Sequence, residues 1–237
     1  MDEELRDALQ RKADSEGQSV SDFVRDAIAN AVFDFRSPGA DDRVIDPKSL
    51  DPLERHKLAL LHRILAQVLP ENANGVEGDH DYQIERAQVL ENGFVQEYWT
   101  EFAGIRAELT ESQSALVMDV LDMFRITGYS MDEILKEGGV IDDVLRHRLT
   151  FRGFDHNDTL ERHMSNYVAY LVKDGKWTEQ EEFVLGPKRG NSHMPMVSTY
   201  SRMLSAYRAV KESRPRIDGP TTYLLSLEEL ERIAGIR

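Results

Sequence analysis

The stretch of sequence that best defines the fold of this chain reads RLTFRGFD, at residues 148–155. It interrupts a succession of helical patterns with two phenylalanines, a glycine and an aspartate. We interpret it as a structured turn in which Gly153 takes a backbone angle that favours glycine. The rings of Phe151 and Phe154 then fill core, and Asp155 caps the helix that follows.

The same segment has a second interpretation, as a binding site. Arg148, Arg152, Asp155 and His156 would together form a polar site for an anion or a nucleotide. Helix capping accounts for Asp155 without any ligand, so we favour the structural interpretation. The polar site is kept as the alternative.

Helical spacing of apolar residues extends from this segment in both directions and predicts an all-α protein. Asp51 caps one expected helix and Pro52 occupies its first position. We expect helices at about 52–69, 82–92, 94–102, 111–127, 130–137, 141–149, 156–172 and 195–210, and a last helix that begins at Ser226. A stripe of large side chains on the helix at 195–210 is assigned to the core rather than to a cofactor site: Tyr200, Met203, Leu204 and Tyr207.

Capping patterns set the limits of several of these helices. Thr110 and Gln113 form a capping box, as do Ser226 and Glu229. Gly128 is expected to end the helix that begins after Thr110. The next helix would then start as a separate element.

The first 33 residues carry two short amphipathic helices, at 3–16 and 19–32, with Gly17 between them. Their apolar stripes are too large for two such short helices to bury alone. We therefore expect a second copy of the chain to cover them. The expected dimer core is made by five apolar side chains: Leu5, Leu9, Phe23, Val24 and Ile28. Residues 34–49 form a linker to a larger multi-helix domain at 50–237.

Composition restricts the compartment and the partners. The chain has no cysteine, its start is acidic, and no apolar run is long enough for a signal peptide or a membrane span. We expect a cytoplasmic protein without a membrane partner. The formal net charge of −14 repels phosphate backbones at long range. This charge is the main argument against DNA binding.

No sequence motif indicates catalysis or a cofactor. The chain has no P-loop, no G-x-G-x-x-G and no G-x-S-x-G, so we assign no catalytic residue and no cofactor. None of the seven histidines stands four residues from another, and we assign no metal site.

The N-terminal helix pair resembles the Arc/MetJ-type ribbon-helix-helix family. The resemblance is carried by ELRDAL at residues 4–9 and GQSVSDFVRDAI at residues 17–28. It implies two intertwined chains whose paired N-terminal strands enter the DNA major groove. It also implies that the start of the second helix, at Ser19, Val20 and Ser21, contacts DNA phosphates through backbone N–H groups.

Two features depart from the ribbon-helix-helix pattern. The strand should precede Asp2, where this chain has only Met1. Residues 1–33 also hold four basic against eight acidic residues, a net charge of −4. We therefore expect the native gene product to be longer than this chain, with the missing strand upstream.

The remainder of the chain, from about residue 50, resembles the YfbU family of bacterial proteins. The resemblance is carried, in order, by the segment at 148–155, Tyr167-Val168, Pro195-Met196, Tyr200, Arg202-Met203-Leu204 and LEELERI at 227–233. It implies a family and no assigned activity.

Three hypotheses of function follow. The first is a dimeric DNA-binding transcriptional regulator with a YfbU-type helical domain for sensing or interaction. The second keeps the helix pair as a dimerisation element only, with an unassigned interaction or nucleotide-related activity in the larger domain. The third is an enzyme that acts on nucleotides or RNA through Arg148, Asp155 and His156, which we place last. The sequence does not identify the operator, the ligand or the biological process.

Overall fold

The computed structural model describes residues 49–70, 73, 75, 78–214 and 223–236, together with residues 10, 11 and 20. Within these residues the chain is helical and forms no β-strand, which confirms the expected all-α class. The N-terminal helix pair, with its expected dimer core and the phosphate contacts at Ser19 and Ser21, lies outside them. Val20 is described only as an isolated helical residue.

The described helices fall into two compact units, divided between Glu108 and Leu109. We call the described residues of Ala40–Glu108 the hairpin unit and those of Leu109–Arg237 the main unit. The sequence pattern indicated a single domain over 50–237, and the structure places two cores in that range.

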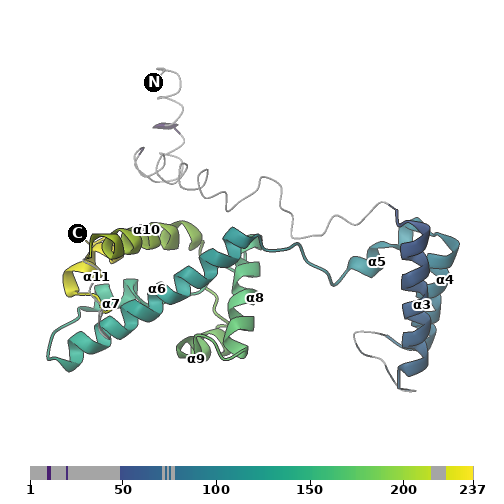
Figure 1. Cartoon of the computed structure of the whole chain (residues 1–237), viewed down its shortest axis with the longest axis horizontal. Helices are drawn as coiled ribbons and strands as arrows, with labels where there is room; N and C mark the ends of the chain where they lie inside the picture. Colours follow the sequence, from purple (N-terminus) through teal and green to yellow (C-terminus); the bar gives the residue numbers. More distant parts are fainter. Residues whose placement is uncertain are drawn as a thin grey trace. The chain divides into compact units, whose positions relative to one another are not determined.

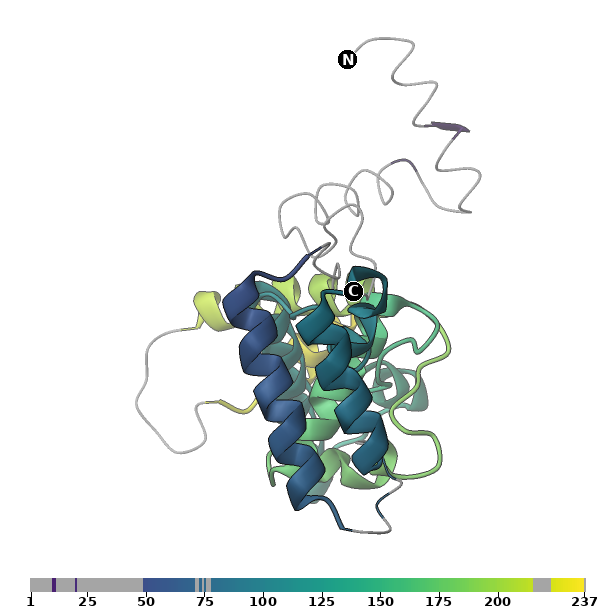
Figure 2. The ribbon, with the colours of Figure 1, turned by 90° about the vertical axis from the view of Figure 1, so that its right-hand side faces the viewer.

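The hairpin unit consists of two long helices and a short third segment. Helix α3 (Pro52–Val68) and helix α4 (His80–Asn92) lie side by side, as Figures 1 and 2 show. A 3-10 turn, η1 (Val95–Glu97), and the short helix α5 (Trp99–Phe102) follow. As expected, Asp51 caps α3, its carboxylate accepting from the amide of Leu53 at 2.8 Å.

The core of the hairpin unit is small. The buried apolar side chains that cluster in it are Ala59, Ala87, Val89, Leu90 and Tyr98. Helix α3 instead exposes a stripe of apolar side chains on its surface. We call this stripe the α3 face: Leu53, Leu60, Leu61, Ile64 and Val68, each between 46% and 68% exposed. Exposed apolar side chains this closely grouped are typical of a surface that binds another chain.

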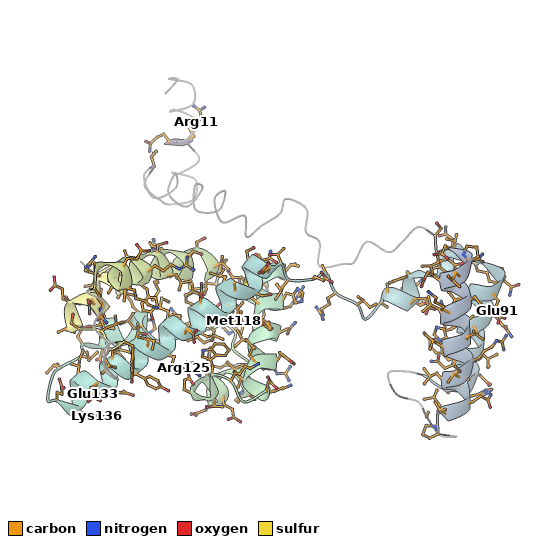
Figure 3. The ribbon with its side chains drawn as sticks, in the orientation of Figure 1. Arg11, Glu91, Met118, Arg125, Glu133 and Lys136 are labelled. Carbon is orange, nitrogen blue, oxygen red and sulfur yellow. The ribbon has the colours of Figure 1, made fainter. Side chains whose placement is uncertain are left out.

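An exposed ion pair joins the two long helices. The guanidinium of Arg63 on α3 donates two hydrogen bonds to the carboxylate of Glu91 on α4, at 2.8 and 2.7 Å. Figure 3 labels Glu91 beside the two long helices. Because the pair is solvated, it contributes no more than about 1 kcal/mol to stability.

The main unit is built around the long helix α6 (Glu111–Lys136). The other helices are α7 (Asp143–Arg148), α8 (Thr159–Lys173), α9 (Glu181–Leu185), α10 (Val197–Ser213) and α11 (Leu227–Ala234), with a 3-10 turn η2 (Thr178–Gln180) before α9. Helices α8, α10 and α11 all contact α6. The stripe of α10 is buried as expected, from Tyr200 to Tyr207.

The expected end of the long helix at Gly128 is wrong. Helix α6 continues through Gly128 to Lys136, so the two helices expected at 111–127 and 130–137 are one. Thr127 and Met131 are buried on either side of the glycine. A glycine inside a helix costs only about 1 kcal/mol, which the burial of the following turn offsets.

Capping boxes begin the first and the last helix of the main unit, as the sequence indicated. Thr110 and Gln113 exchange both hydrogen bonds at the start of α6, at 3.2 and 2.8 Å. Ser226 and Glu229 do the same at the start of α11.

Among the described residues, no helix has the length and apolar character needed to cross a lipid bilayer.

Candidate functional site

The turn at residues 150–156 lies beside the loop that follows α9. The amide of Phe154 donates to the carbonyl of Gly190 at 3.1 Å, and the amide of Ser192 donates to the carbonyl of Phe154 at 3.1 Å. Gly153 has φ +78°, as expected of a glycine-dependent turn. A Cβ at Gly153 would overlap the carbonyl oxygen of Gly190. The two segments approach each other closely because this position has no side chain.

Tyr200 from α10 holds the same turn from inside the core. Its hydroxyl accepts a hydrogen bond from the amide of Arg152 at 3.1 Å and donates one to the carbonyl of Gly153 at 2.9 Å. Its ring packs edge-on against Phe154 and Phe124. Burial raises the pKa of the Tyr200 hydroxyl well above its ordinary value, so the group stays a neutral donor.

Asp155 does not cap the following helix, which corrects the sequence interpretation. The cap of α8 is Asp158, whose carboxylate accepts from the amide of Glu161 at 2.9 Å. The buried carboxylate of Asp155 instead accepts from the amide of Asn157 at 2.9 Å and tightens the turn before the cap. Two aspartates three residues apart make either cap plausible in sequence, and the backbone conformation decides between them.

Glu161 is the buried group that joins three segments of the main unit. It is fully buried in the first turn of α8. Its Oε1 accepts from the amides of Met196 and Val197 at 2.7 and 2.9 Å, and its Oε2 accepts from the amide of Asp155 at 2.8 Å. Burial raises the pKa of Glu161 and the three amides oppose that rise. Because α10 has no side-chain cap of its own, Glu161 supplies the cap from another helix.

His156 also has a structural partner. Its Nε2 lies 2.9 Å from the hydroxyl of Ser165 on α8, and its amide donates to Oδ1 of Asn191 at 3.2 Å. Neither His156 nor Asp155 lines the pocket described next. The structure therefore separates the expected polar site into two pairs, with Asp155 and His156 in the turn and Arg148 and Arg152 in a pocket.

The pocket that contains Arg148 and Arg152 has a volume of about 290 Å³ and lies between the end of α7, the first turns of α10 and the end of α11. We call it the arginine pocket. Arg202 of α10 and Arg232 of α11 complete its four arginines. No aspartate or glutamate is among its lining residues, although the whole chain has 43 acidic side chains against 29 basic ones.

The arginines of the pocket differ in what holds them. Nη1 of Arg148 donates to the carbonyls of Ala234 and Gly235 at 3.0 and 3.2 Å, and so fixes that side chain to the end of α11. The side chains of Arg152, Arg202 and Arg232 make no hydrogen bond or ion pair with any residue that the structure describes. Their N–H donors therefore remain for solvent or a ligand.

A wider and more open cleft of about 1000 Å³ adjoins the arginine pocket and shares His147, Thr150 and Arg152 with it. This cleft has mixed charge, because Glu179 and Glu182 line it together with Lys188 and other basic residues. Glu179 is held by a two-fold hydrogen bond from Arg125 on α6, which Figure 3 labels. The mixed charge makes the cleft a weaker anion site than the pocket.

The hairpin unit contains a buried polar network that the sequence did not reveal. His62 of α3 lies 2.6 Å from Oε1 of Gln83 through Nδ1 and 2.8 Å from Oε2 of Glu101 through Nε2. Arg86 donates to Oε1 of Glu101 at 3.0 Å and to the carbonyl of Glu97 at 2.8 Å. The hydrogen bond to Glu101 raises the pKa of His62. Burial tends to raise the pKa of Glu101, and the bonds from His62 and Arg86 lower it overall.

This network predicts a pH-dependent stability for the hairpin unit. A histidine whose folded pKa is raised stabilises the fold fully below its unfolded pKa, about 6.5, and loses that contribution as pH rises through the folded pKa. We therefore expect the free energy of unfolding of the hairpin unit to fall as pH rises above 6.5. The measurement is denaturant unfolding at several pH values, followed by the fluorescence of Trp99 in a Trp177→Phe background, because Trp177 of the main unit would otherwise contribute to the signal. His62→Gln should remove this pH dependence, whereas His56→Gln, on the exposed part of the same helix, should keep it. An unchanged slope in His62→Gln would contradict the assignment.

The structure gives no indication of a metal centre within the described residues. No three histidine, aspartate or glutamate side chains among them come together as a metal site would require. Besides the polar network of the hairpin unit, sequence reasoning did not identify Glu161, Arg202 and Arg232 as site residues. Helix periodicity places each of these residues on the polar face of its own helix. It cannot show which other helix packs against that face.

Two comparisons identify relatives of this chain. The family model of the YfbU domain matches residues 49–235. A UPF0304 protein of Methanocaldococcus jannaschii is 28% identical over 164 residues, which cover 68% of this chain and 88% of that protein. No solved structure matches the chain. The match to the family model covers both described units from the start of α3 to the end of α11, and the chain therefore belongs to the YfbU family.

Proposed function

We propose that the chain is a homodimeric DNA-binding transcriptional regulator, in which residues 1–33 bind DNA and the YfbU domain senses a ligand or binds a partner. The observation that carries the proposal is the ribbon-helix-helix pattern of residues 1–33, which the linker at 34–49 joins directly to the exposed α3 face. A ribbon-helix-helix module works as an intertwined pair of chains. It would bring two copies of α3 within reach of each other.

The α3 face supports self-association for a second reason. Leu53, Leu60 and Ile64 lie seven and four residues apart, which is the spacing of one face of a helix that packs lengthwise on another helix. Two copies of this face would bury each other's apolar surface. In this proposal, dimerisation through residues 1–33 and through α3 would reinforce each other.

A second candidate function has its own support. The net charge of −14, and of −4 within residues 1–33, opposes the approach of a phosphate backbone. On this alternative the helix pair only dimerises the chain, and the YfbU domain carries an unassigned interaction or nucleotide-related activity. The enzyme hypothesis loses support, because Asp155 and His156 have structural partners and lie outside the pocket of Arg148.

The proposal predicts a salt-dependent gel shift with genomic DNA fragments. The expected phosphate contacts are backbone amides at the start of the second helix, so a negative charge there should repel DNA. Ser21→Glu should weaken binding about tenfold or more, since a charge of the wrong sign there acts on every sequence alike. A glutamate in the first turn of a helix favours folding, so the helix pair should persist.

The matched control is Ser37→Glu, which makes the same charge change in the linker and should bind DNA like the parent chain. Light scattering on the same samples reports the oligomeric state. A dimer that gives no gel shift at low salt would replace the proposal with the dimerisation-only alternative. A monomer at micromolar concentration would exclude both the regulator and the dimerisation-only alternative.

A further inference from the structure

We propose that the arginine pocket is a binding site for a small phosphate-bearing anion. This inference names a class of ligand for the sensing role proposed above. It rests on that role only for the biological purpose of the site. The site itself is carried by the side chains of Arg148, Arg152, Arg202 and Arg232, which line one pocket of about 290 Å³ without a carboxylate among them.

The charge of the pocket is the first argument. Four arginines that line one small pocket bring like charges together, and those charges repel each other unless an anion balances them. Such groups usually lie beside carboxylates, as Arg63, Arg125 and Arg208 do elsewhere on this chain. The pocket lacks these partners, and an anionic ligand would supply them.

The donor chemistry is the second argument. A guanidinium presents planar pairs of N–H donors that match the oxygens of a phosphate or a carboxylate. Arg148 is fixed by two carbonyls at the end of α11, which leaves its Nε and Nη2 without a hydrogen bond among the described residues. The charge of a phosphate ester or pyrophosphate, near −2 or beyond, fits four cations better than a single carboxylate does.

The shape of the pocket and the charge around it restrict the size of the ligand. Ligand pockets commonly have volumes of about 300–1000 Å³, so this one suits a small molecule. The lining residues include Met196, Met203 and Ile233, which offer apolar contact to the body of such a molecule. A long nucleic-acid strand would extend beyond the pocket and meet the negative field of a chain with a net charge of −14.

The experiment is isothermal titration calorimetry on the full chain, in phosphate-free buffer at low chloride, with three probes. The probes are pyrophosphate, inorganic phosphate and the dicarboxylate succinate. We expect pyrophosphate to bind most tightly, phosphate more weakly and succinate most weakly. Arg202→Gln and Arg232→Gln should each weaken pyrophosphate binding about tenfold, or roughly 1.4 kcal/mol. Both side chains are exposed and make no hydrogen bond or ion pair with another described residue.

The control is Arg208→Gln, which removes the same charge from the same helix outside the pocket. It should change pyrophosphate affinity less than twofold. If Arg208→Gln and Arg202→Gln weakened pyrophosphate binding equally, the anion would be attracted by positive charge anywhere on the surface. That result would overturn the proposed site. Tighter binding of succinate than of pyrophosphate would overturn the ligand class. The absence of binding at millimolar probe would overturn the whole inference, while the gel shift of the chain tests the regulator separately.

Discussion

Replacing Gly153 by alanine is expected to cost the main unit more than about 3 kcal/mol, enough to unfold a marginally stable domain. Two effects add at this position. The backbone has φ +78°, where an L side chain costs roughly 1–2 kcal/mol. The new Cβ would also overlap the carbonyl oxygen of Gly190, which cannot move aside without breaking its hydrogen bond from Phe154.

Gly175→Ala is the matched control for this variant. Gly175 has nearly the same backbone angle, φ +79°, but a Cβ there would meet nothing within 4 Å. It should therefore show only the backbone cost of roughly 1–2 kcal/mol. Denaturant unfolding of both variants, followed by circular dichroism, separates the free-energy cost of the backbone angle from that of the overlap with Gly190. Similar losses in the two variants would show that the contact with Gly190 has no energetic role.

Replacing Glu161 by alanine should destabilise the main unit by about 3–5 kcal/mol, as the loss of a buried, fully bonded carboxylate typically does. Three buried amides, those of Asp155, Met196 and Val197, would lose their acceptor at once. For a unit of this size the melting temperature should fall by roughly 10–20 °C. Differential scanning calorimetry measures the change.

Glu161→Gln gives a finer test of the same arrangement. Glutamine keeps the shape and one oxygen, but its amide group would turn N–H donors toward backbone N–H donors. We expect it to lose a large part of the stability that alanine loses, rather than to behave as a conservative change. Glu182→Ala, on the exposed surface of α9, should have little effect. A stable Glu161→Gln would mean that only one oxygen is needed.

The sequence predicted those parts of the fold that depend on local interactions. The capping boxes at Thr110 and Ser226 satisfy amides within four residues, so the residue pattern alone is enough to locate them. The prediction that Gly128 ends the helix was wrong because tertiary packing outweighs the local preference of glycine. The helix continues past Gly128, and Met131 in the following turn is buried in the core. The prediction that Asp155 caps α8 was wrong because Asp158, three residues later, has the same carboxylate and accepts the hydrogen bond from the amide of Glu161.

The candidate site was only half predictable for a similar reason. Arg148 and Arg152 are close in sequence, so a shared pocket could be inferred from their spacing. Arg202 and Arg232 come from α10 and α11, and no local pattern shows that these helices end beside α7. Glu161 resembles an ordinary acidic residue in the first turn of a helix. Its burial depends on the approach of α10.

The unequal cores of the two units affect how the molecule opens. The core cluster of the hairpin unit has five buried apolar side chains among the described residues, whereas the core of the main unit draws on helices from α6 to α11. Cooperative units with such different cores open with different free energies. Backbone amides of α3 and α4 should exchange with solvent deuterium through local opening, long before those of α6 and α10. A heat-capacity trace of this chain should accordingly contain two transitions, and a single melting temperature would not describe it.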